Sequence, residues 1–260
     1  MKNKTIEESI ASAMEDENIN LNKFYPYILQ DFWEIGTSSD EVLKIIKKYK
    51  DNYSNLSVLD LGSGKGAVLI KIASELKCKC LGVDAIDDFV NFSNNKAKEY
   101  SVDSICTFET NDIRTRIKTL GKYDIIILGA IGPVLGDFHE TLLVLTSHLN
   151  DNGLIIMNEG YVEDGCKTDY PNVLSKNIVL NQINSAGMEI IESIIEDETH
   201  EVKGDFEEEV RNLEKRCMEL IEKYPDNKNM FLKYIKTQKE LYKKLDNEVI
   251  SVLFVIKQKV

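Results

Sequence analysis

Short apolar runs alternate with longer amphipathic stretches along most of the chain. Each apolar run predicts a strand, and five of them lie at 56–61, 79–84, 105–109, 123–128 and 153–158. Helical periodicity marks the stretches that follow them at 65–76, 88–100 and 137–149. Because the strands are apolar at nearly every position, we expect both of their faces to be buried. The alternation predicts a parallel α/β sheet that helices cover on both sides.

The pattern changes after the fifth predicted strand. A helix is expected over 172–186 and a strand over 188–196, and a charge-rich stretch with two helical apolar faces then runs from about 203 to 246. Pro225 and the polar residues after it separate these faces and predict the turn of a helical hairpin. An apolar strand at 249–257 closes the chain. The hairpin is therefore an insertion between the last two strands, and we interpret it as part of a lid or as a dimer surface, with simple support of the sheet as the alternative. A homodimer is thus one of these expectations.

Two further helices are expected before the sheet, at 5–17 and 40–50, joined by an aromatic-rich stretch. We therefore divide the chain into three parts. They are an N-terminal helical cap at 1–50, an α/β domain at 51–198 and 247–260, and the helical hairpin insertion at 199–246.

The most informative motif is Val-Leu-Asp-Leu-Gly-Ser-Gly-Lys-Gly at 58–66, where a buried strand ends in three alternating glycines. Glycines let a ligand approach the backbone closely, and the helix that follows leaves its first amide groups free. The motif therefore predicts a site for a nucleotide-like ligand. A phosphate-binding P-loop does not fit, because Leu59 stands where its first glycine belongs. A dinucleotide fingerprint does fit over 62–67, with Asp84 at the ribose-binding position, so an NAD-dependent oxidoreductase is one interpretation.

Three further features distinguish between the nucleotides. Asp60 lies inside the first strand, Asp112 follows the third, and the last strand comes after the hairpin, as expected for a seventh strand inserted antiparallel to the others. Together with the glycine motif and the run Leu-Gly-Val-Asp at 81–84, these features resemble the class I S-adenosylmethionine-dependent methyltransferases. The resemblance covers about 35–197 and 248–258. It implies a Rossmann-like, doubly wound, seven-stranded sheet and S-adenosylmethionine as the cofactor.

The same resemblance implies roles for the residues of the glycine motif. Gly62, Ser63 and Gly64 would lie under the amino-acid and ribose portions of the cofactor. Asp60 would orient the loop, or would meet the amino group of the cofactor through water. As an alternative, an acid at the end of a strand can simply form a turn.

Roles for the later strands follow from the resemblance in the same way. Asp84, with Ala85 beside it, would accept both ribose hydroxyls, since an ionised acceptor binds such a pair strongly. Asp112 would accept from the adenine amino group, and Ile113 would pack on the adenine ring. Gly129 would keep space open near the sulfonium. For Asp112, the structural alternative is a helix N-cap.

The methyl acceptor has a weaker signature than the cofactor. Methyl transfer from a sulfonium is an in-line displacement in which the enzyme aligns the reactants and excludes water, so no catalytic constellation is required. The Asn-Pro-Pro-Tyr signature, which the family uses on the amino groups of bases and glutamine, is replaced here by Leu-Gly-Ala-Ile-Gly-Pro at 128–133. This stretch looks like that of small-molecule methyltransferases. In them the N-terminal segment, the loops after the fourth and fifth strands and the late insertion build the acceptor pocket.

For the pocket of a small-molecule acceptor, we expect a lining of Tyr27, Trp33, Glu159, Tyr161 and residues of the hairpin. Glu159 is the candidate catalytic residue, either as a general base or as the partner of a cation. The aromatic side chains would cradle an amine or a quaternary nitrogen, with ordinary core packing as the alternative. A non-catalytic module that binds S-adenosylmethionine and signals through the hairpin is the alternative to an enzyme.

The composition of the chain argues against several classes of partner. The chain carries 32 Lys and Arg against 44 Asp and Glu, a formal net charge of −12, which argues against binding to a nucleic-acid backbone. No segment approaches the roughly 20 apolar residues that span a bilayer, and the polar start of the sequence lacks the apolar region of a signal peptide. We therefore expect a cytoplasmic protein with no membrane partner. The five scattered cysteines lack the paired spacing of a zinc site, so no metal is expected.

Overall fold

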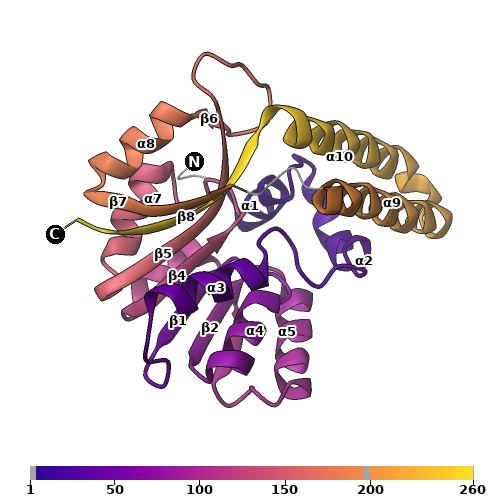
Figure 1. Ribbon diagram of the computed structural model, residues 1–260. Helices are drawn as coiled ribbons and strands as arrows, with labels where there is room; N and C mark the ends of the chain where they lie inside the picture. Colours follow the sequence, from indigo (N-terminus) through magenta and orange to yellow (C-terminus); the bar gives the residue numbers. More distant parts are fainter. Residues whose placement is uncertain (1–3, 196–199, 260) are drawn as a thin grey trace.

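One sheet runs through the middle of the molecule, and helices cover both of its faces (Figure 1). The computed structural model describes residues 4–195 and 200–259. Within these ranges, seven strands follow one another in the order β3-β2-β1-β4-β5-β8-β7, and a short eighth strand, β6, pairs with the end of β5. The strands are β1 (Ser57–Leu61), β2 (Lys79–Asp84), β3 (Cys106–Thr110), β4 (Tyr123–Gly129), β5 (Leu149–Val162), β6 (Leu174–Ser175), β7 (Met188–Ile195) and β8 (Ile250–Gln258).

The strand order confirms the predicted doubly wound sheet with an antiparallel last strand. Strands β1 to β5 pair in parallel, and the order reverses between β1 and β4. Strand β8 is antiparallel to both β5 and β7. The eighth strand was not expected, because its two residues fall at the start of the helix predicted at 172–186. They pair with Tyr161 and Val162 at the end of β5, and the helix begins only after them.

Side chains along each strand alternate between two cores, one on each face of the sheet. Val58 and Ile125 contribute to the core under α3, α4 and α5. Their neighbours Leu59 and Ile126 contribute to the core under the opposite layer of helices. This two-sided burial explains why the strands read as continuous apolar runs in the sequence.

The helices form one layer on each face of the sheet (Figure 1). Ser38 begins α3 by accepting a hydrogen bond from Glu41 N, and Asp137 begins α7 in the same way from Glu140 N, as polar N-caps do. One layer consists of α3 (Ser39–Tyr49), α4 (Ala67–Leu76) and α5 (Asp87–Glu99). The other consists of α6 (Ile113–Arg116), the 3₁₀ turn at Ile117–Thr119, α7 (Phe138–Thr146) and α8 (Lys176–Ser185).

The N-terminal helices and the hairpin share a third core beside the sheet. The N-terminal part consists of α1 (Ile6–Ala13), a 3₁₀ turn (Ile19–Phe24) and α2 (Tyr25–Ile28), and the hairpin consists of α9 (His200–Lys223), a 3₁₀ turn (Pro225–Asn227) and α10 (Lys228–Glu248). Phe24 packs edge-on against Phe231, with ring centroids 5.0 Å apart. Leu213 and Leu220 of α9 join the same cluster. Two parts that strands β1 to β7 separate in the sequence therefore form one helical cap.

Helix α1 is shorter than the predicted helix at 5–17. It ends at Ala13, because Glu15 adopts a left-handed backbone with φ of 54° and Asp16 N donates back to Ala11 O at 2.9 Å. This early end turns the Glu15 side chain toward the sheet, where it lines a cavity described below.

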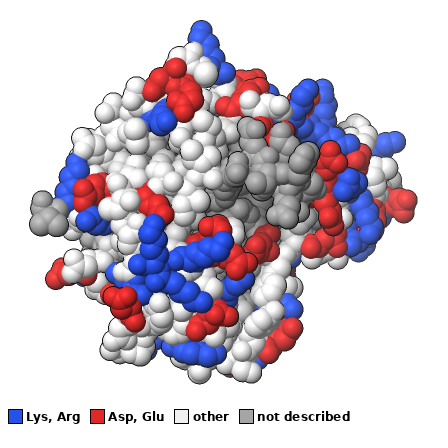
Figure 2. Space-filling model, viewed as in Figure 1, with Lys and Arg blue, Asp and Glu red and all other residues white. Residues whose placement is uncertain are grey.

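Charges of both signs are interleaved over the surface seen in Figure 2. The basic stretch of α3 illustrates this arrangement, since Lys47 pairs with Glu75 at 3.2 Å and Lys48 with Glu192 at 2.6 Å. On the hairpin, Lys239 pairs with Glu214 at 2.7 Å. In the described ranges, no helix combines the length and the apolar character needed to cross a membrane.

We expect the shared core of the cap to contribute to global stability. Phe231 is fully buried in it, whereas the adjacent Leu232 is 41% exposed. Phe231→Ala should lower the free energy of unfolding by about 3–5 kcal/mol, because it removes a buried ring and leaves a cavity. Leu232→Ala is the matched control, with an expected loss below about 1 kcal/mol. Urea denaturation followed by circular dichroism measures both, and equal losses would contradict the role of the shared core.

Candidate functional site

The loop after β1 turns on glycines at the point where the strand order reverses. Gly62, Gly64 and Gly66 have φ values of 82°, 51° and 76°, a region that side chains other than glycine rarely adopt. A Cβ atom on Gly62 would lie 2.3 Å from Ile131 Cγ2, so the loop can approach the segment after β4 only without a side chain. A Cβ atom on Gly64 would meet nothing within 4 Å, which places this residue at an open face.

The Asp84 carboxylate at the end of β2 holds the loop in this conformation. One oxygen accepts a hydrogen bond from Gly64 N at 2.8 Å, and the other accepts one from Ile86 N at 2.9 Å. Burial raises the pKa of Asp84 to about 6, although these backbone N–H groups oppose the shift. The group is thus mainly ionised at neutral pH. Each oxygen keeps a further lone pair that can accept from a ligand hydroxyl.

Asp60 lies in β1, two residues before the loop, and is 4% exposed. Burial, and then the nearby Asp84, raise the pKa of Asp60 to about 8. No hydrogen bond or ion pair to this carboxyl comes from the described residues. A buried acid without a partner is a site that a bound cationic group can complete.

A cavity lies over the glycine loop, and we call it the loop cavity. It brings together seven of the predicted cofactor residues, namely Gly62, Gly64, Asp84, Ala85, Asp112, Ile113 and Gly129. Asp60 and Ser63 belong to the same strand and loop but do not line it. Sequence reasoning missed the contribution of α1, which adds Ile6, Ser9, Ile10 and Ala13. The amphipathic pattern of α1 predicted a helix but gave no sign of where that helix packs.

Asp112 has a structural role as well as a place in the cavity wall. It caps α6 by accepting from Arg114 N at 2.9 Å, and it forms an ion pair with the Arg114 guanidinium at 2.7 Å. Burial alone would raise the pKa of Asp112, but the hydrogen bonds from Arg114 outweigh it and hold the pKa below its usual range. The N-cap alternative is therefore realised, and the contact with adenine stays a prediction.

A second cavity of about 470 Å³ adjoins the first, and we call it the roofed cavity. The two cavities share Ala13, Gly36 and Ala130 in their walls. Several segments that are distant in the sequence line the roofed cavity. Most of the lining comes from the end of α1, the loop after β4, the end of β5 with the loop that follows it, and the facing side of the hairpin, and Gly36, Val249 and Ser251 complete it.

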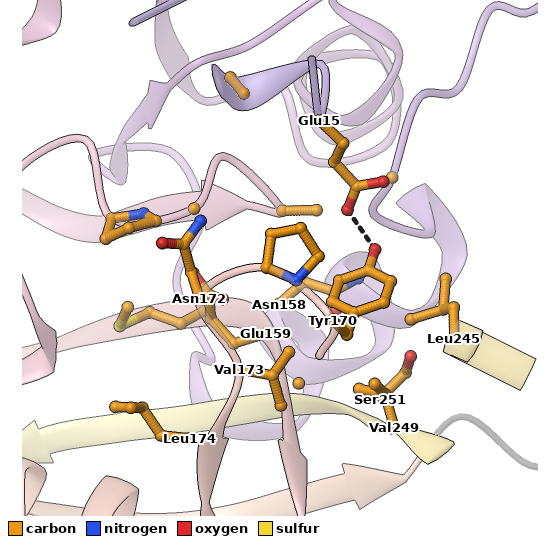
Figure 3. A pocket seen from close by; sticks show the side chains of 18 of the residues that line it. Glu15, Asn158, Glu159, Tyr170, Asn172, Val173, Leu174, Leu245, Val249 and Ser251 are labelled. Carbon is orange, nitrogen blue, oxygen red and sulfur yellow. Dashed lines mark hydrogen bonds between the residues drawn. The ribbon is translucent and has the colours of Figure 1, made fainter. Parts of the chain in front are cut away.

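Acids and tyrosines meet in the roofed cavity (Figure 3). The Tyr170 hydroxyl donates a hydrogen bond to the Glu15 carboxylate, and the Tyr242 hydroxyl donates one to Glu209 at 2.9 Å. Burial raises the pKa of Glu15, although the hydrogen bond from Tyr170 opposes the shift. Burial also raises the pKa of Glu159, to about 7. No hydrogen bond or ion pair to Glu159 comes from the described residues.

Of the four residues predicted to line an acceptor pocket, the structure brings only Glu159 into the roofed cavity. Tyr27 is 40% exposed on the cap, where its hydroxyl donates to Glu219 at 2.7 Å. Trp33 packs against Tyr100 and donates from Nε1 to the Lys65 carbonyl at 3.1 Å. Tyr161 is buried in the core beside Phe254. Core packing, which was the alternative, accounts for Tyr161, whereas Trp33 and Tyr27 make local contacts with the glycine loop and the hairpin.

Tyr170 and Tyr242 take the positions that the prediction gave to other aromatic residues. Tyr170 lies in the loop between β5 and β6, and Tyr242 lies on α10. Neither stands in a motif. Their helical or loop context is common to many surface tyrosines, so the sequence offered no signal for them.

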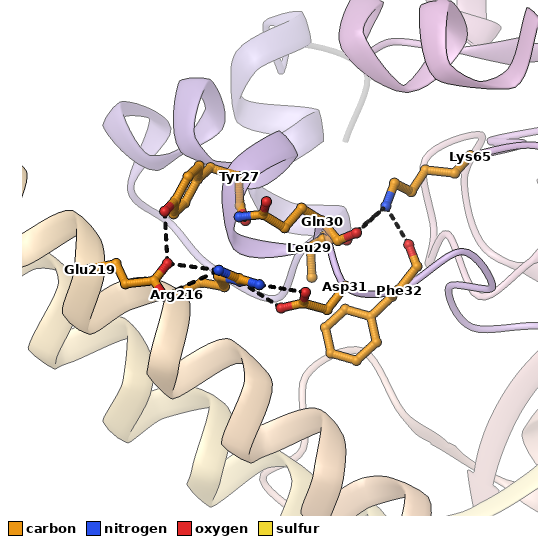
Figure 4. A network of polar contacts seen from close by, with 8 residues as sticks. All are labelled: Tyr27, Leu29, Gln30, Asp31, Phe32, Lys65, Arg216 and Glu219. Carbon is orange, nitrogen blue, oxygen red and sulfur yellow. Dashed lines mark hydrogen bonds and ion pairs between the residues drawn. The ribbon is translucent and has the colours of Figure 1, made fainter. Parts of the chain in front are cut away.

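A buried lysine connects the glycine loop to the cap (Figure 4). Lys65 is 5% exposed, and its Nζ donates to the carbonyl oxygens of Leu29 at 2.8 Å and of Phe32. Burial lowers the pKa of Lys65 to about 8. From the same turn, Asp31 pairs with Arg216 of α9 through two contacts of 2.6 Å. These polar contacts thus join the glycine loop, the N-terminal segment and the hairpin.

Comparisons with known proteins identify the family of this chain. A family model described as a methyltransferase domain matches residues 52–258. Release factor glutamine methyltransferase of Buchnera aphidicola is 33% identical over 86 residues, which are 31% of this chain and 30% of that protein. Ubiquinone biosynthesis O-methyltransferase of Rickettsia akari is 25% identical over 118 residues, 44% of each protein. The matches thus span less than half the length of either curated relative.

Among solved structures, the fold is similar to that of a SAM-dependent methyltransferase from Thiobacillus denitrificans in complex with S-adenosyl-L-homocysteine. The TM-score is 0.75 at 16% identity, over 91% of this chain and 98% of that one. This likeness concerns the fold.

The buried acids predict how the stability of the ligand-free protein depends on pH. In the unfolded chain, Asp60 loses its proton near pH 4, whereas in the folded protein its pKa is about 8. The unfolded state therefore binds fewer protons between these values, so the free energy of unfolding falls as the pH rises through this window. Asp60→Asn removes this effect and should be more stable than the wild type at pH 8, by about 2–4 kcal/mol.

Denaturation of the ligand-free protein at several pH values measures this difference, which should shrink toward pH 4. Asp103→Asn, at an exposed position, is the control and should follow the wild type. Equal stability of Asp60→Asn and the wild type at pH 8 would show that the Asp60 carboxyl is not held in an unfavourable site.

Proposed function

The chain belongs to the class I S-adenosylmethionine-dependent methyltransferases, through the domain matched at residues 52–258, and from this premise we propose that it methylates a small molecule bound in the roofed cavity. The donor S-adenosylmethionine supplies an electrophilic methyl group on a positively charged sulfur. The observation that carries the proposal is the pair of adjoining cavities, which share Ala13, Gly36 and Ala130 in their walls.

The loop cavity has the features that this donor requires. Gly64 presents an open backbone face, and Asp84 keeps lone pairs for ribose hydroxyls. Asp60, buried without a partner among the described residues, suits the cationic amino group of the donor. Ile113 and Phe89 line the same cavity and offer apolar surface to a base.

A small molecule fits the roofed cavity better than a protein side chain does. About 470 Å³ lies within the range of ligand pockets, roughly 300–1,000 Å³. The hairpin and the end of α1 both line it, so that several segments would surround the acceptor. One curated relative is named for a protein acceptor and another for ubiquinone biosynthesis, so the relatives allow both classes. The replacement of Asn-Pro-Pro-Tyr at 128–133 also favours the small molecule.

The protein contributes alignment and proton removal to the reaction. The walls shared by the two cavities bring the acceptor against the donor and exclude water, and this positioning supplies most of the rate enhancement. We assign Glu159 as the general base, because a pKa of about 7 suits proton transfer at neutral pH. We also assign the hairpin as the lid of the acceptor site, since Gln238, Tyr242 and Leu245 face the roofed cavity. A homodimer stays a prediction that size-exclusion chromatography tests.

Transfer of a labelled methyl group tests the proposal. The purified protein, given methyl-labelled S-adenosylmethionine and a cell extract, should place the label in the low-molecular-weight ultrafiltrate. Glu159→Gln should lower kcat by about 10²-fold or more, because the general base is lost. Glu163→Gln, whose carboxylate pairs with Lys176 outside the cavity, is the matched control and should keep its activity.

Three outcomes would contradict the proposal. Label found only in protein would move the acceptor to another class. Binding of S-adenosylmethionine without any formation of S-adenosylhomocysteine would favour a non-catalytic module. Thermal stabilisation by NAD alone would restore the oxidoreductase interpretation.

A further inference from the structure

The charge of the roofed cavity is one-sided. Its described lining contains four acids, Glu15, Asp137, Glu159 and Glu209, and no Lys, Arg or His among the same residues. The remaining polar groups come from tyrosine, serine, threonine, asparagine and glutamine side chains. An anionic ligand would meet four carboxylates with no cation to balance it, which is strongly unfavourable away from bulk water.

Three of the four acids already have partners within the protein. Asp137 accepts from Glu140 N at 2.9 Å as the N-cap of α7, and Glu15 accepts from the Tyr170 hydroxyl. Glu209 accepts from the Tyr242 hydroxyl. Glu159 alone among these acids receives no hydrogen bond or ion pair from the described residues, although it is half-buried and lines the cavity. Its carboxylate is therefore the acid of this lining that can bind a ligand cation.

Glu159 lies close to Ala130, one of the wall residues that the two cavities share. It follows Asn158, which pairs with Gly129 in the parallel register of β4 and β5. The Asn158 carbonyl accepts a hydrogen bond from Ala130 N at 3.1 Å. Gly129 lines the loop cavity, and Ala130 lines both cavities. A cation bound to Glu159 thus lies on the acceptor side of the point where donor and acceptor meet.

We propose that the roofed cavity selects a protonated amine and that the nitrogen of this amine receives the methyl group. The inference rests on the proposed function and adds to it the chemical class of the acceptor. A cationic nitrogen gives Glu159 the charge-assisted hydrogen bond that the protein does not supply. Tyr170 and Tyr242 offer ring faces and hydroxyl groups around the same space.

The reaction balances with this acceptor. Glu159 takes one proton from the ammonium group, which frees the nitrogen lone pair. That lone pair forms the new N–C bond as the S–C bond of the donor breaks, and the bonding pair stays on sulfur. The products are S-adenosylhomocysteine and a methylated ammonium ion, and the proton on Glu159 leaves to solvent. No oxidant, reductant or metal takes part.

Binding of three probes of equal length tests charge selectivity on the wild-type protein. They are n-butylammonium, n-butanol and n-butyrate, each titrated into protein saturated with S-adenosylhomocysteine and followed by saturation-transfer NMR. We expect n-butylammonium to bind about 10-fold or more tightly than n-butanol, the gain of one hydrogen bond to a charged group. No saturation transfer is expected for n-butyrate.

Two variants test whether Glu159 is the source of the preference for the ammonium probe. Glu159→Gln should lower the affinity for n-butylammonium about 10-fold and leave that for n-butanol unchanged. Glu163→Gln should change neither. A thermal shift with S-adenosylhomocysteine reports that each variant is folded, and the comparison of probes on the wild-type protein needs no variant.

Two results would overturn the inference, namely equal binding of n-butanol and n-butylammonium, or an unchanged n-butylammonium affinity in Glu159→Gln. Either result, obtained with intact binding of S-adenosylhomocysteine, leaves the proposed methyltransferase function standing. Absence of S-adenosylhomocysteine binding to the wild type would instead contradict the proposed function itself. The two failures are thus distinguishable.

Discussion

A buried ammonium group must be surrounded by acceptors, and the acceptors of Lys65 determine how the cap sits on the sheet. Its Nζ atom donates hydrogen bonds to the carbonyl oxygens of Leu29, Gln30 and Phe32, which all belong to the turn after α2. An unpaired charge at this depth would cost several kcal/mol, so the turn cannot move away without exposing the ammonium to water. Because α1 and the hairpin pack on this segment, both cavities depend on this contact.

The same network extends the constraint from one side of the site to the other. Asp31 in the turn pairs with Arg216, and Arg216 also contacts Glu219, which accepts from Tyr27. Surface ion pairs contribute little one at a time, but here the two-pronged Arg216–Asp31 contact supplements the apolar packing of α9 on α2. The position of the cap is therefore coupled to that of the glycine loop through Lys65. Asp60 and Glu159 act against this stabilising network, because each is removed from water without a hydrogen bond or ion pair from the described residues.

The sheet and most of the lining of the loop cavity could be predicted because their signals are local. The strands read as apolar runs, and the glycine loop, Asp84 and Gly129 lie at the ends of those strands, where topology alone brings them together. Local signals fail where tertiary contacts decide. The first helix ends early because Glu15 adopts a left-handed backbone, and β6 exists only because β5 continues far enough to pair with it. Lys65 looks like an ordinary polar residue of the glycine motif, and nothing in the sequence indicates which carbonyl oxygens accept its hydrogen bonds.

The acceptor half shows why function is harder to predict than fold in this molecule. Its walls come mainly from α1, the loop after β4, β5 with its following loop, and the hairpin, which lie far apart in the sequence. Tyr27, Trp33 and Tyr161 had the right chemistry in the right segments, yet their side chains face the cap surface, the back of the glycine loop and the core. A rotation of about 100° separates neighbouring positions on a helix, and successive strand residues face opposite sides, so a segment can be assigned correctly while its facing residue is missed. Glu159 was named because the resemblance assigned the acceptor pocket to the segment after the fifth predicted strand, and the structure places this residue in the wall of the roofed cavity.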